Sequence, residues 1–162
     1  MLALFSEYIA QIFVNITLAM GVFHLYIILN TFVILALSIT STLIKAEGKV
    51  SPEAVAGAIT VDATEAKKLF DAEVMFIDVR KDKDWMAGRV PGAEHIELKK
   101  VYSEKTLSEF VKKDQDFVIY CNGEKCMRSS KASALAVEWG FKKAHYFRDG
   151  LPAWKKANYP VE

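Results

Sequence analysis

The distribution of apolar and charged residues divides the chain into two unlike parts. From Tyr8 to Ile44 there is no Asp, Glu, Lys or Arg, and the segment is apolar almost throughout. From Lys45 onward, short apolar runs alternate with stretches in which apolar residues recur every three or four positions. The first pattern is typical of a membrane span or an exported leader, and the second is typical of a folded α/β domain.

The second part contains apolar runs that predict buried strands and periodic stretches that predict helices. The strands are expected at residues 74–80, 95–98, 117–120 and 144–147, and the helices at residues 61–70, 106–112 and 129–139. Apolar strands that alternate with helices predict a parallel sheet covered by helices on both faces. Chemistry in such folds gathers at the carboxyl ends of strands, where Cys121 and Asp78 are expected.

We expect three regions along the chain. They are a hydrophobic signal or membrane-anchor segment at 1–46, a linker at 47–60 and one compact domain at 61–162. The hydrophobic segment has three interpretations: one or two membrane helices, a leader for export with Met20 as its true start, or a buried helix of a larger assembly. No Lys or Arg precedes the apolar run, unlike a usual leader, while the lysines after it weakly favour a cytoplasmic domain. We expect a cell-envelope protein, membrane-anchored or exported to the periplasm, with the side left open.

Charge and cysteine content exclude several classes of protein. The 162 residues carry 21 Lys and Arg against 20 Asp and Glu, so the formal net charge is +1, without the basic excess of nucleic-acid-binding proteins. The chain has two cysteines, Cys121 and Cys126, which are too few for a disulfide framework. Their spacing and that of the three histidines match no zinc site, so no metal is expected.

Cys121 lies where a buried strand is expected to run into a polar loop, with a helix beginning at Ser129. The N-terminus of a helix offers unpaired backbone N–H groups and the positive end of a dipole. Lys125 and Arg128 add full positive charges to the same loop. Each of these features favours a thiolate over a thiol and attracts an anion, so the sequence predicts a reactive thiolate at Cys121.

Four motifs, in order along residues 61–162, resemble those of a single rhodanese domain, with Arg89 standing where that family commonly has His. They are Ile-Asp-Val-Arg at 77–80, Trp-x3-Arg-Val-Pro-Gly-Ala at 85–93, Tyr-Cys at 120–121 followed by Gly123, Arg128 and Ser129, and Gly-Phe at 140–141 followed by Asp-Gly-Leu-Pro-Ala-Trp at 149–154. The resemblance implies the rhodanese fold and a sulfurtransferase. Cys121 would then attack a sulfane sulfur and carry it as a persulfide.

The expected active-site loop departs from the common single-domain pattern. In that pattern the Arg follows the cysteine by five positions, whereas Arg128 follows Cys121 by seven, and the longer loop contains Cys126. This is similar to a rhodanese subgroup with a second loop cysteine. Cys126 has two interpretations: a resolving thiol that attacks a Cys121 persulfide or sulfenate and leaves a Cys121–Cys126 disulfide, or a residue that fills space under the loop. A related phosphatase loop is disfavoured, because its Arg would fall at Met127.

The resemblance implies roles for the rest of the loop and for a neighbouring strand end. The expected substrate-binding loop comprises Asn122, Gly123, Glu124, Lys125, Met127, Arg128 and Ser129. Lys125 and Arg128 are expected to bind the anionic group of the donor, with a solvated Lys125 and a shape-holding Arg128 as alternatives. Glu124 favours a thiol persulfide over a doubly charged donor. Asp78 and Arg80 are expected to brace the site by pairing within the domain.

The sequence therefore predicts a sulfurtransferase that uses a Cys121 persulfide. Its donor would be a small anion, thiosulfate or a persulfide, and its acceptor a thiol, cyanide or a partner protein. The alternative is a non-catalytic envelope module that docks to a partner through a reversible Cys121–Cys126 disulfide. Membrane contact is expected through the N-terminal segment, and no nucleic acid is expected as a partner.

Overall fold

The computed structural model describes residues 50–162 of the chain. The chain separates into two units, Met1–Glu47 and Gly48–Glu162, and the second is the one described here. The signal or membrane-anchor segment predicted at 1–46 lies outside the described residues. Within residues 50–162, the structure contains no helix with the length and apolar character needed to cross a bilayer.

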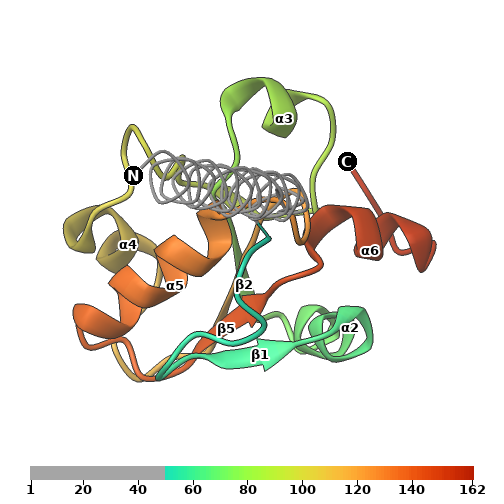
Figure 1. The fold of residues 1–162 in the computed structure, drawn as a ribbon. Coiled ribbons are helices and arrows are strands. Elements are labelled where there is room, and N and C mark those ends of the chain that lie inside the picture. The colour runs from blue at the N-terminus through green and yellow to red at the C-terminus, as the bar shows by residue number, and fades with distance from the viewer. Residues whose placement is uncertain (1–49) are drawn as a thin grey trace, which may run out of the picture. The chain divides into compact units, whose positions relative to one another are not determined.

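The described unit is built on a five-stranded parallel sheet (Figure 1). Its strands are β1 (Ile59–Val61), β2 (Met75–Asp78), β3 (Glu94–His95), β4 (Phe117–Tyr120) and β5 (Ala144–Phe147). They lie in the order β1-β5-β4-β2-β3, and each neighbouring pair is parallel. Strand β4 is therefore in the middle, and its carboxyl end lies between those of β2 and β5.

Helices cover both faces of this sheet (Figure 1). They are α2 (Ala63–Asp71), α3 (Asp82–Met86), α4 (Glu104–Phe110), α5 (Arg128–Glu138) and α6 (Gly150–Lys156). Helices α4 and α5 pack on one face, and α2 and α6 pack on the other. The parallel sheet between two helical layers confirms the α/β architecture predicted from the sequence.

The apolar run of β4 forms a strand because both of its faces are covered. Phe117 and Ile119 belong to the core cluster that contains Leu107 of α4 and Ala132 of α5. Val118 and Tyr120 belong to the other core cluster, which includes residues of α2 and α6. Successive side chains point to opposite faces of a strand, so a strand buried on both sides must be apolar at every position.

Local signals place several helix ends correctly. Asp62 caps α2, accepting a hydrogen bond from the Glu65 backbone N–H at 2.8 Å, while the Glu65 carboxylate accepts from the Asp62 N–H. Gly140 follows α5 with φ of +86°, which is the left-handed conformation that ends helices. The helix predicted from Ser129 begins one residue earlier, at Arg128.

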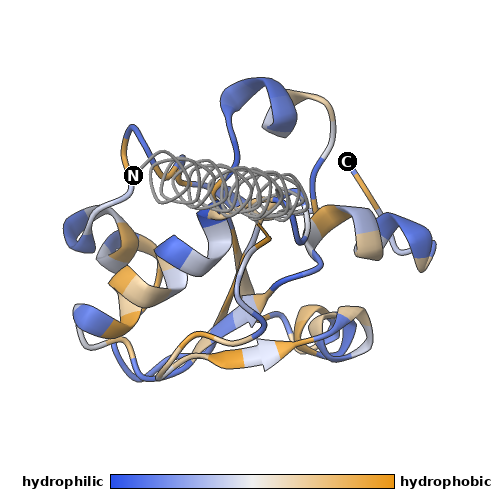
Figure 2. Cartoon of the chain, in the orientation of Figure 1, coloured by the Kyte–Doolittle hydropathy of each residue, from blue (hydrophilic) through white to orange (hydrophobic). Residues whose placement is uncertain are grey.

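Two short elements do not follow from the sequence pattern. Helix α3 has five residues, too few to show a helical period, and Figure 2 shows it as largely hydrophilic. Strand β1 falls at the end of the stretch interpreted as a linker, and two of its three residues are exposed. An edge strand of this length buries too little surface to produce an apolar run.

Candidate active site

Cys121 directly follows β4 and is fully buried. Its carbonyl oxygen accepts a hydrogen bond from the backbone N–H of Leu151 at 3.0 Å. This contact requires Gly150, since a Cβ atom there would lie 2.1 Å from the same carbonyl oxygen, and φ of Gly150 is +55°. The start of α6 therefore holds the backbone of Cys121, and only glycine fits between them.

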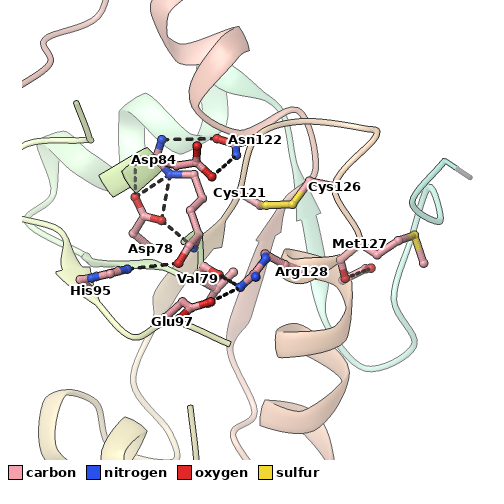
Figure 3. The surroundings of a disulfide bond; sticks show 12 residues. Asp78, Val79, Asp84, His95, Glu97, Cys121, Asn122, Cys126, Met127 and Arg128 are labelled. Atoms are coloured by element: carbon pink, nitrogen blue, oxygen red, sulfur yellow. Dashed lines mark hydrogen bonds and ion pairs between the residues drawn. A yellow bond between two sulfur atoms is a disulfide. The ribbon is translucent and has the colours of Figure 1, made fainter. Parts of the chain in front are cut away.

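A disulfide joins Cys121 to Cys126, with their Cα atoms 6.3 Å apart (Figure 3). The residues between them form a turn in which the N–H of Cys126 donates to the carbonyl of Gly123 at 2.8 Å. Gly123 has φ of +89°, and a Cβ atom there would lie 3.2 Å from the Asp149 carbonyl oxygen. We call residues 121–128 the cysteine loop. Its fold brings the two cysteines together, the condition that a disulfide between such close neighbours requires.

Asp78 and Arg80 form a buried ion pair at the neighbouring strand end. Arg80 donates from Nε and Nη2 to the carboxylate of Asp78 at distances between 2.6 and 2.9 Å. Burial alone would lower the pKa of the Arg80 guanidinium, but the hydrogen bonds and charge of Asp78 outweigh it, and the pKa is raised. The guanidinium is therefore permanently charged.

Arg80 also ties Asn122 of the cysteine loop to the domain. Its Nη2 donates to the Gly88 carbonyl at 2.8 Å, and its Nη1 lies 3.4 Å from Oδ1 of Asn122. The Asn122 amide in turn donates to Asp84 at 3.0 Å. His95 donates from Nε2 to the Arg80 carbonyl at 3.1 Å. Arg80 thus links β2, β3, α3 and the loop, which is a bracing arrangement of the kind expected from the sequence.

Arg128, drawn with Glu97 and Val79 in Figure 3, is engaged by both of them. Its Nη1 donates to Oε1 of Glu97 at 2.9 Å and to the carbonyl oxygen of Val79 at 3.2 Å. Glu97 is buried, and its second oxygen lies 3.6 Å from the ammonium of Lys100. The charge of Arg128 is therefore matched by a buried carboxylate. These contacts give Arg128 a structural role beside the donor-binding role expected from the sequence.

The outer part of the cysteine loop carries exposed charges of both signs. Glu124 and Lys125 are exposed. With the rest of 122–125 they line an open hollow of about 470 Å³, whose far side includes Asp149 and Lys156. Two carboxylates and two ammonium groups therefore face the same space. Neither cysteine lines this hollow, and Cys121 is fully buried.

The chain just before β1 is fastened to the same loop. The N–H of Ser51 donates to the carbonyl of Glu124 at 2.7 Å. Arg148, which follows β5, donates from Nε and Nη2 to the Ser51 carbonyl at 3.3 and 3.2 Å, and its Nη1 lies 3.5 Å from the Glu124 carboxylate. Ser51 is buried. This part of the predicted linker therefore packs against the domain.

The last loop residues lead into α5. Met127 is the N-cap of this helix without a side-chain cap bond, and its carbonyl accepts from the Ser130 hydroxyl at 3.1 Å. Ser129 is fully buried in the first turn, and its hydroxyl has no hydrogen-bond partner in the part of the chain that the structure describes. Cys121 is therefore followed closely by the N-terminal end of a helix.

Sequence reasoning missed four polar residues at this edge, which are Asp84, Glu97, Arg148 and Asp149. Three of them follow β3 or β5 closely, as Cys121 follows β4. The carboxyl ends of parallel strands share one edge, so these positions were in principle recognisable. Within residues 50–162, the structure groups no three metal-ligating side chains.

The comparisons with known proteins agree with this architecture. The profile of the rhodanese-like domain family matches residues 62–157. This chain belongs to the rhodanese-like domain family. The match contains β2, β4, β5 and the whole cysteine loop, so the family assignment covers every residue of the site except the Ser51 segment.

Two curated proteins show how this domain occurs elsewhere. Thiosulfate sulfurtransferase GlpE of Pseudoalteromonas translucida is 29% identical over 98 residues, which are 60% of this chain and 89% of that protein. An HTH-type transcriptional regulator of Mycobacterium tuberculosis is 32% identical over 90 residues, which are 56% of this chain but 38% of the regulator. The chain thus spans well under half the length of that regulator, and the shared part is one domain.

Solved structures share the fold. A rhodanese-like domain from Anabaena sp. is 24% identical, with a TM-score of 0.55 over 64% of this chain and 77% of that chain. The polysulfide-sulfur transferase homodimer from Wolinella succinogenes is 22% identical, with a TM-score of 0.52 over 66% of this chain and 80% of that one. At the level of the family, these findings support a role of the sulfurtransferase type.

Proposed function

We propose that this rhodanese-like domain is a sulfurtransferase in which Cys121 carries the sulfur. The supporting observation is the position of Cys121, which directly follows the central strand and leads through the cysteine loop to the N-terminal end of α5. Backbone N–H groups at a helix start favour a thiolate and an anionic persulfide. The disulfide occupies this nucleophile, so the cycle begins with a reduced chain.

The chemistry consists of two displacements at sulfur. The Cys121 thiolate attacks the sulfane sulfur of the donor, and the rest of the donor leaves with the electron pair of the broken bond, as sulfite from thiosulfate or as a thiolate from a persulfide. A thiolate or cyanide then attacks the outer sulfur of the Cys121 persulfide, and Cys121 leaves as a thiolate. Neither step needs a metal or an organic cofactor.

The charges around the hollow favour a thiol persulfide as the donor. Glu124 and Asp149 balance Lys125 and Lys156, so a doubly charged anion gains no net attraction there. The guanidinium groups of Arg80 and Arg128 are matched by Asp78 and Glu97, and that of Arg148 lies 3.5 Å from the Glu124 carboxylate. A peptide-like persulfide that carries both an ammonium and carboxylates complements this surface. We expect glutathione persulfide to load Cys121 faster than thiosulfate at equal concentration.

Sulfur uptake by the reduced full chain tests the proposed function. The purified chain, in detergent, is reduced, freed of reductant and exposed to each donor, and its intact mass is then measured. We expect Cys126→Ser to gain one sulfur atom at Cys121 and to form thiocyanate on addition of cyanide, while Cys121→Ser does neither. Both variants keep the size of the side chain. If Cys126→Ser gains no sulfur from either donor while its fold is intact, the proposed function is wrong.

The disulfide favours a second candidate function, that of a redox-responsive module without sulfur transfer. Such a module would cycle between dithiol and disulfide and would change its contacts with a partner. The mass measurement separates the two functions. A chain that loses two hydrogens on mild oxidation, but never gains sulfur when reduced, is a redox module.

A further inference from the structure

The cysteine loop holds the second cysteine within reach of the first. The turn closed by the hydrogen bond from Cys126 to the Gly123 carbonyl at 2.8 Å does not depend on the bond between the sulfurs. Gly123 accommodates the turn with φ of +89°. The loop is also fastened at Asn122, whose side chain donates to Asp84, and at Glu124, whose carbonyl accepts from the Ser51 N–H. None of these contacts involves a sulfur atom, so reduction of the disulfide does not itself remove them.

The two sulfur-bearing residues differ in their access to solvent. Cys121 is fully buried at the end of β4, in contact with the core cluster beneath α5. Cys126 is only partly buried and packs over the same cluster. In the disulfide state that the structure contains, a thiol that arrives from outside therefore meets the sulfur of Cys126 first. A thiol inside the loop, that of Cys126, is the one placed to reach the sulfur of Cys121.

We propose that Cys126 resolves the Cys121 persulfide and releases its outer sulfur as sulfide. This inference rests on the proposed function, because it takes the Cys121 persulfide as its substrate. The Cys126 thiolate attacks Sγ of Cys121, the atom to which the structure shows it bonded. The bond between Cys121 Sγ and Cys126 Sγ forms, and the bond between Cys121 Sγ and the outer sulfur breaks.

The electrons and protons of this step balance. The electron pair of the broken bond leaves with the outer sulfur, which departs as hydrosulfide and takes up the proton lost by the Cys126 thiol. The two cysteines are oxidised by two electrons, and the sulfane sulfur is reduced to sulfide. The products are hydrogen sulfide and the Cys121–Cys126 disulfide, which is the state that the structure contains.

A dithiol reductant closes the cycle. One of its thiolates attacks the more accessible sulfur, Sγ of Cys126, and the Cys121 thiolate leaves beside the start of α5. The second thiol of the reductant then attacks the mixed disulfide at the reductant's own sulfur, which frees Cys126 and leaves the reductant oxidised. The complete cycle consumes a sulfane sulfur and a dithiol and produces sulfide. The domain is thereby a sulfane-sulfur reductase as well as a sulfur carrier.

A single-turnover experiment with the full chain tests this inference. The reduced and desalted chain, in detergent, receives an equimolar amount of glutathione persulfide, and released sulfide and intact mass are followed in time. We expect the wild type to release one sulfide per chain and to lose two hydrogens. We expect Cys126→Ser to keep the added sulfur on Cys121 and to release sulfide at least ten times more slowly. Because the chain has two cysteines, both mass changes can be mapped without ambiguity.

The controls separate this inference from the proposed function and from a packing role. If Cys126→Ser gains sulfur and the wild type keeps its sulfur equally long, Cys126 is not a resolving thiol, although Cys121 remains a sulfur carrier. If Cys126→Ser gains no sulfur, the proposed function itself fails. Thermal unfolding of the reduced wild type and of Cys126→Ser is expected to coincide. A lower melting temperature in the variant, with unchanged sulfide release, would show that Cys126 only packs beneath the loop.

Multiple turnover supplies an independent measurement. With excess glutathione persulfide, we expect sulfide production by the wild type to continue when dithiothreitol is present and to stop after one equivalent when no reductant is added. Cys126→Ser is expected to show no dithiothreitol-dependent cycle above the uncatalysed reaction between donor and reductant. Equal rates in the two proteins would overturn the proposal.

Discussion

The two ends of strand β4 carry opposite kinds of polar structure. Asp116, just before the strand, pairs with His145 at 2.8 Å and with Lys143 at 3.2 Å, and its carboxylate is 39% exposed. At the end of the sheet where Cys121 follows the strand, the ion pairs are Asp78–Arg80 and Glu97–Arg128, whose carboxylate side chains are 0% and 5% exposed. One strand thus connects a solvated cluster of charges with a desolvated one.

The difference shows that the ion pairs held in fixed positions by burial are those at the carboxyl end of the sheet. Exposed ion pairs contribute little to stability, because water screens them and competes for both partners. A buried pair cannot lose one partner without leaving an uncompensated charge in a medium of low polarity. The carboxyl end of the sheet is therefore held in one arrangement, which orients the backbone around Cys121. Arg80 and Arg128 serve this scaffold, whereas the exposed charges of Glu124 and Lys125 line the open hollow.

The largest expected difference between the two ends comes from removing one carboxylate at each. Asp78→Ala leaves the buried Arg80 without its partner, and we expect a loss of about 3–5 kcal/mol in the free energy of unfolding. Asp116→Ala removes an exposed partner and is expected to cost less than about 1 kcal/mol. Urea denaturation measures both. Equal losses would show that the two ends do not differ in this way.

Substituting one glycine near each end of the sheet tests how tightly the backbone is packed there. Gly150→Ala places a Cβ atom 2.1 Å from the Cys121 carbonyl oxygen, and we expect a loss of about 2–4 kcal/mol, together with slower sulfur uptake. Gly140 also has a positive φ, but nothing lies within 4 Å of its added Cβ atom, so Gly140→Ala is expected to cost only about 1 kcal/mol. Thermal unfolding and donor uptake test the pair, and an undisturbed Gly150→Ala variant would contradict the observed close contact.

A smaller effect is expected from neutralising a carboxylate without changing its shape. Glu97→Gln weakens the hydrogen bond from Arg128, and we expect a loss of about 1–3 kcal/mol in unfolding free energy. Glu104→Gln is the matched control, because its pair with Lys113 is exposed and is expected to change stability by less than about 0.5 kcal/mol. Chemical denaturation of both variants decides whether burial sets the size of the effect.

The smallest expected effect is a pH dependence at the solvated end. The hydrogen bond from His145, with that from Lys143, lowers the pKa of Asp116 in the folded chain. Asp116 therefore contributes stability above its unfolded pKa of about 4, and this contribution is lost as the pH falls through the lowered folded value. When the pH is lowered from neutral to about 3, the free energy of unfolding of Asp116→Asn is expected to fall slightly less than that of the wild type. Melting temperatures across this range measure the difference, and identical slopes would contradict it.

Several parts of the site could be predicted because their causes lie close together in the chain. A run of four apolar residues identified β4, and Cys121 follows it directly. The ion pair of Asp78 with Arg80 spans two positions at one strand end. The disulfide spans five positions, and its two cysteines were recognised as a pair although their bonding was left open. Short-range geometry of this kind can be judged from spacing alone.

The sequence by itself determined the alternation of buried strands with amphipathic helices, the capped start of α2 and the position of Cys121 at a strand end. These features depend on residues within a few positions of one another, where spacing dictates which side chains share a face. Only the tertiary structure decided that Arg128 pairs with Glu97 and that Arg148 holds Ser51, contacts that span 31 and 97 positions. Such partners depend on the order β1-β5-β4-β2-β3 and on the shared edge it creates, because strand order is set by the packing of the whole domain and not by any local pattern.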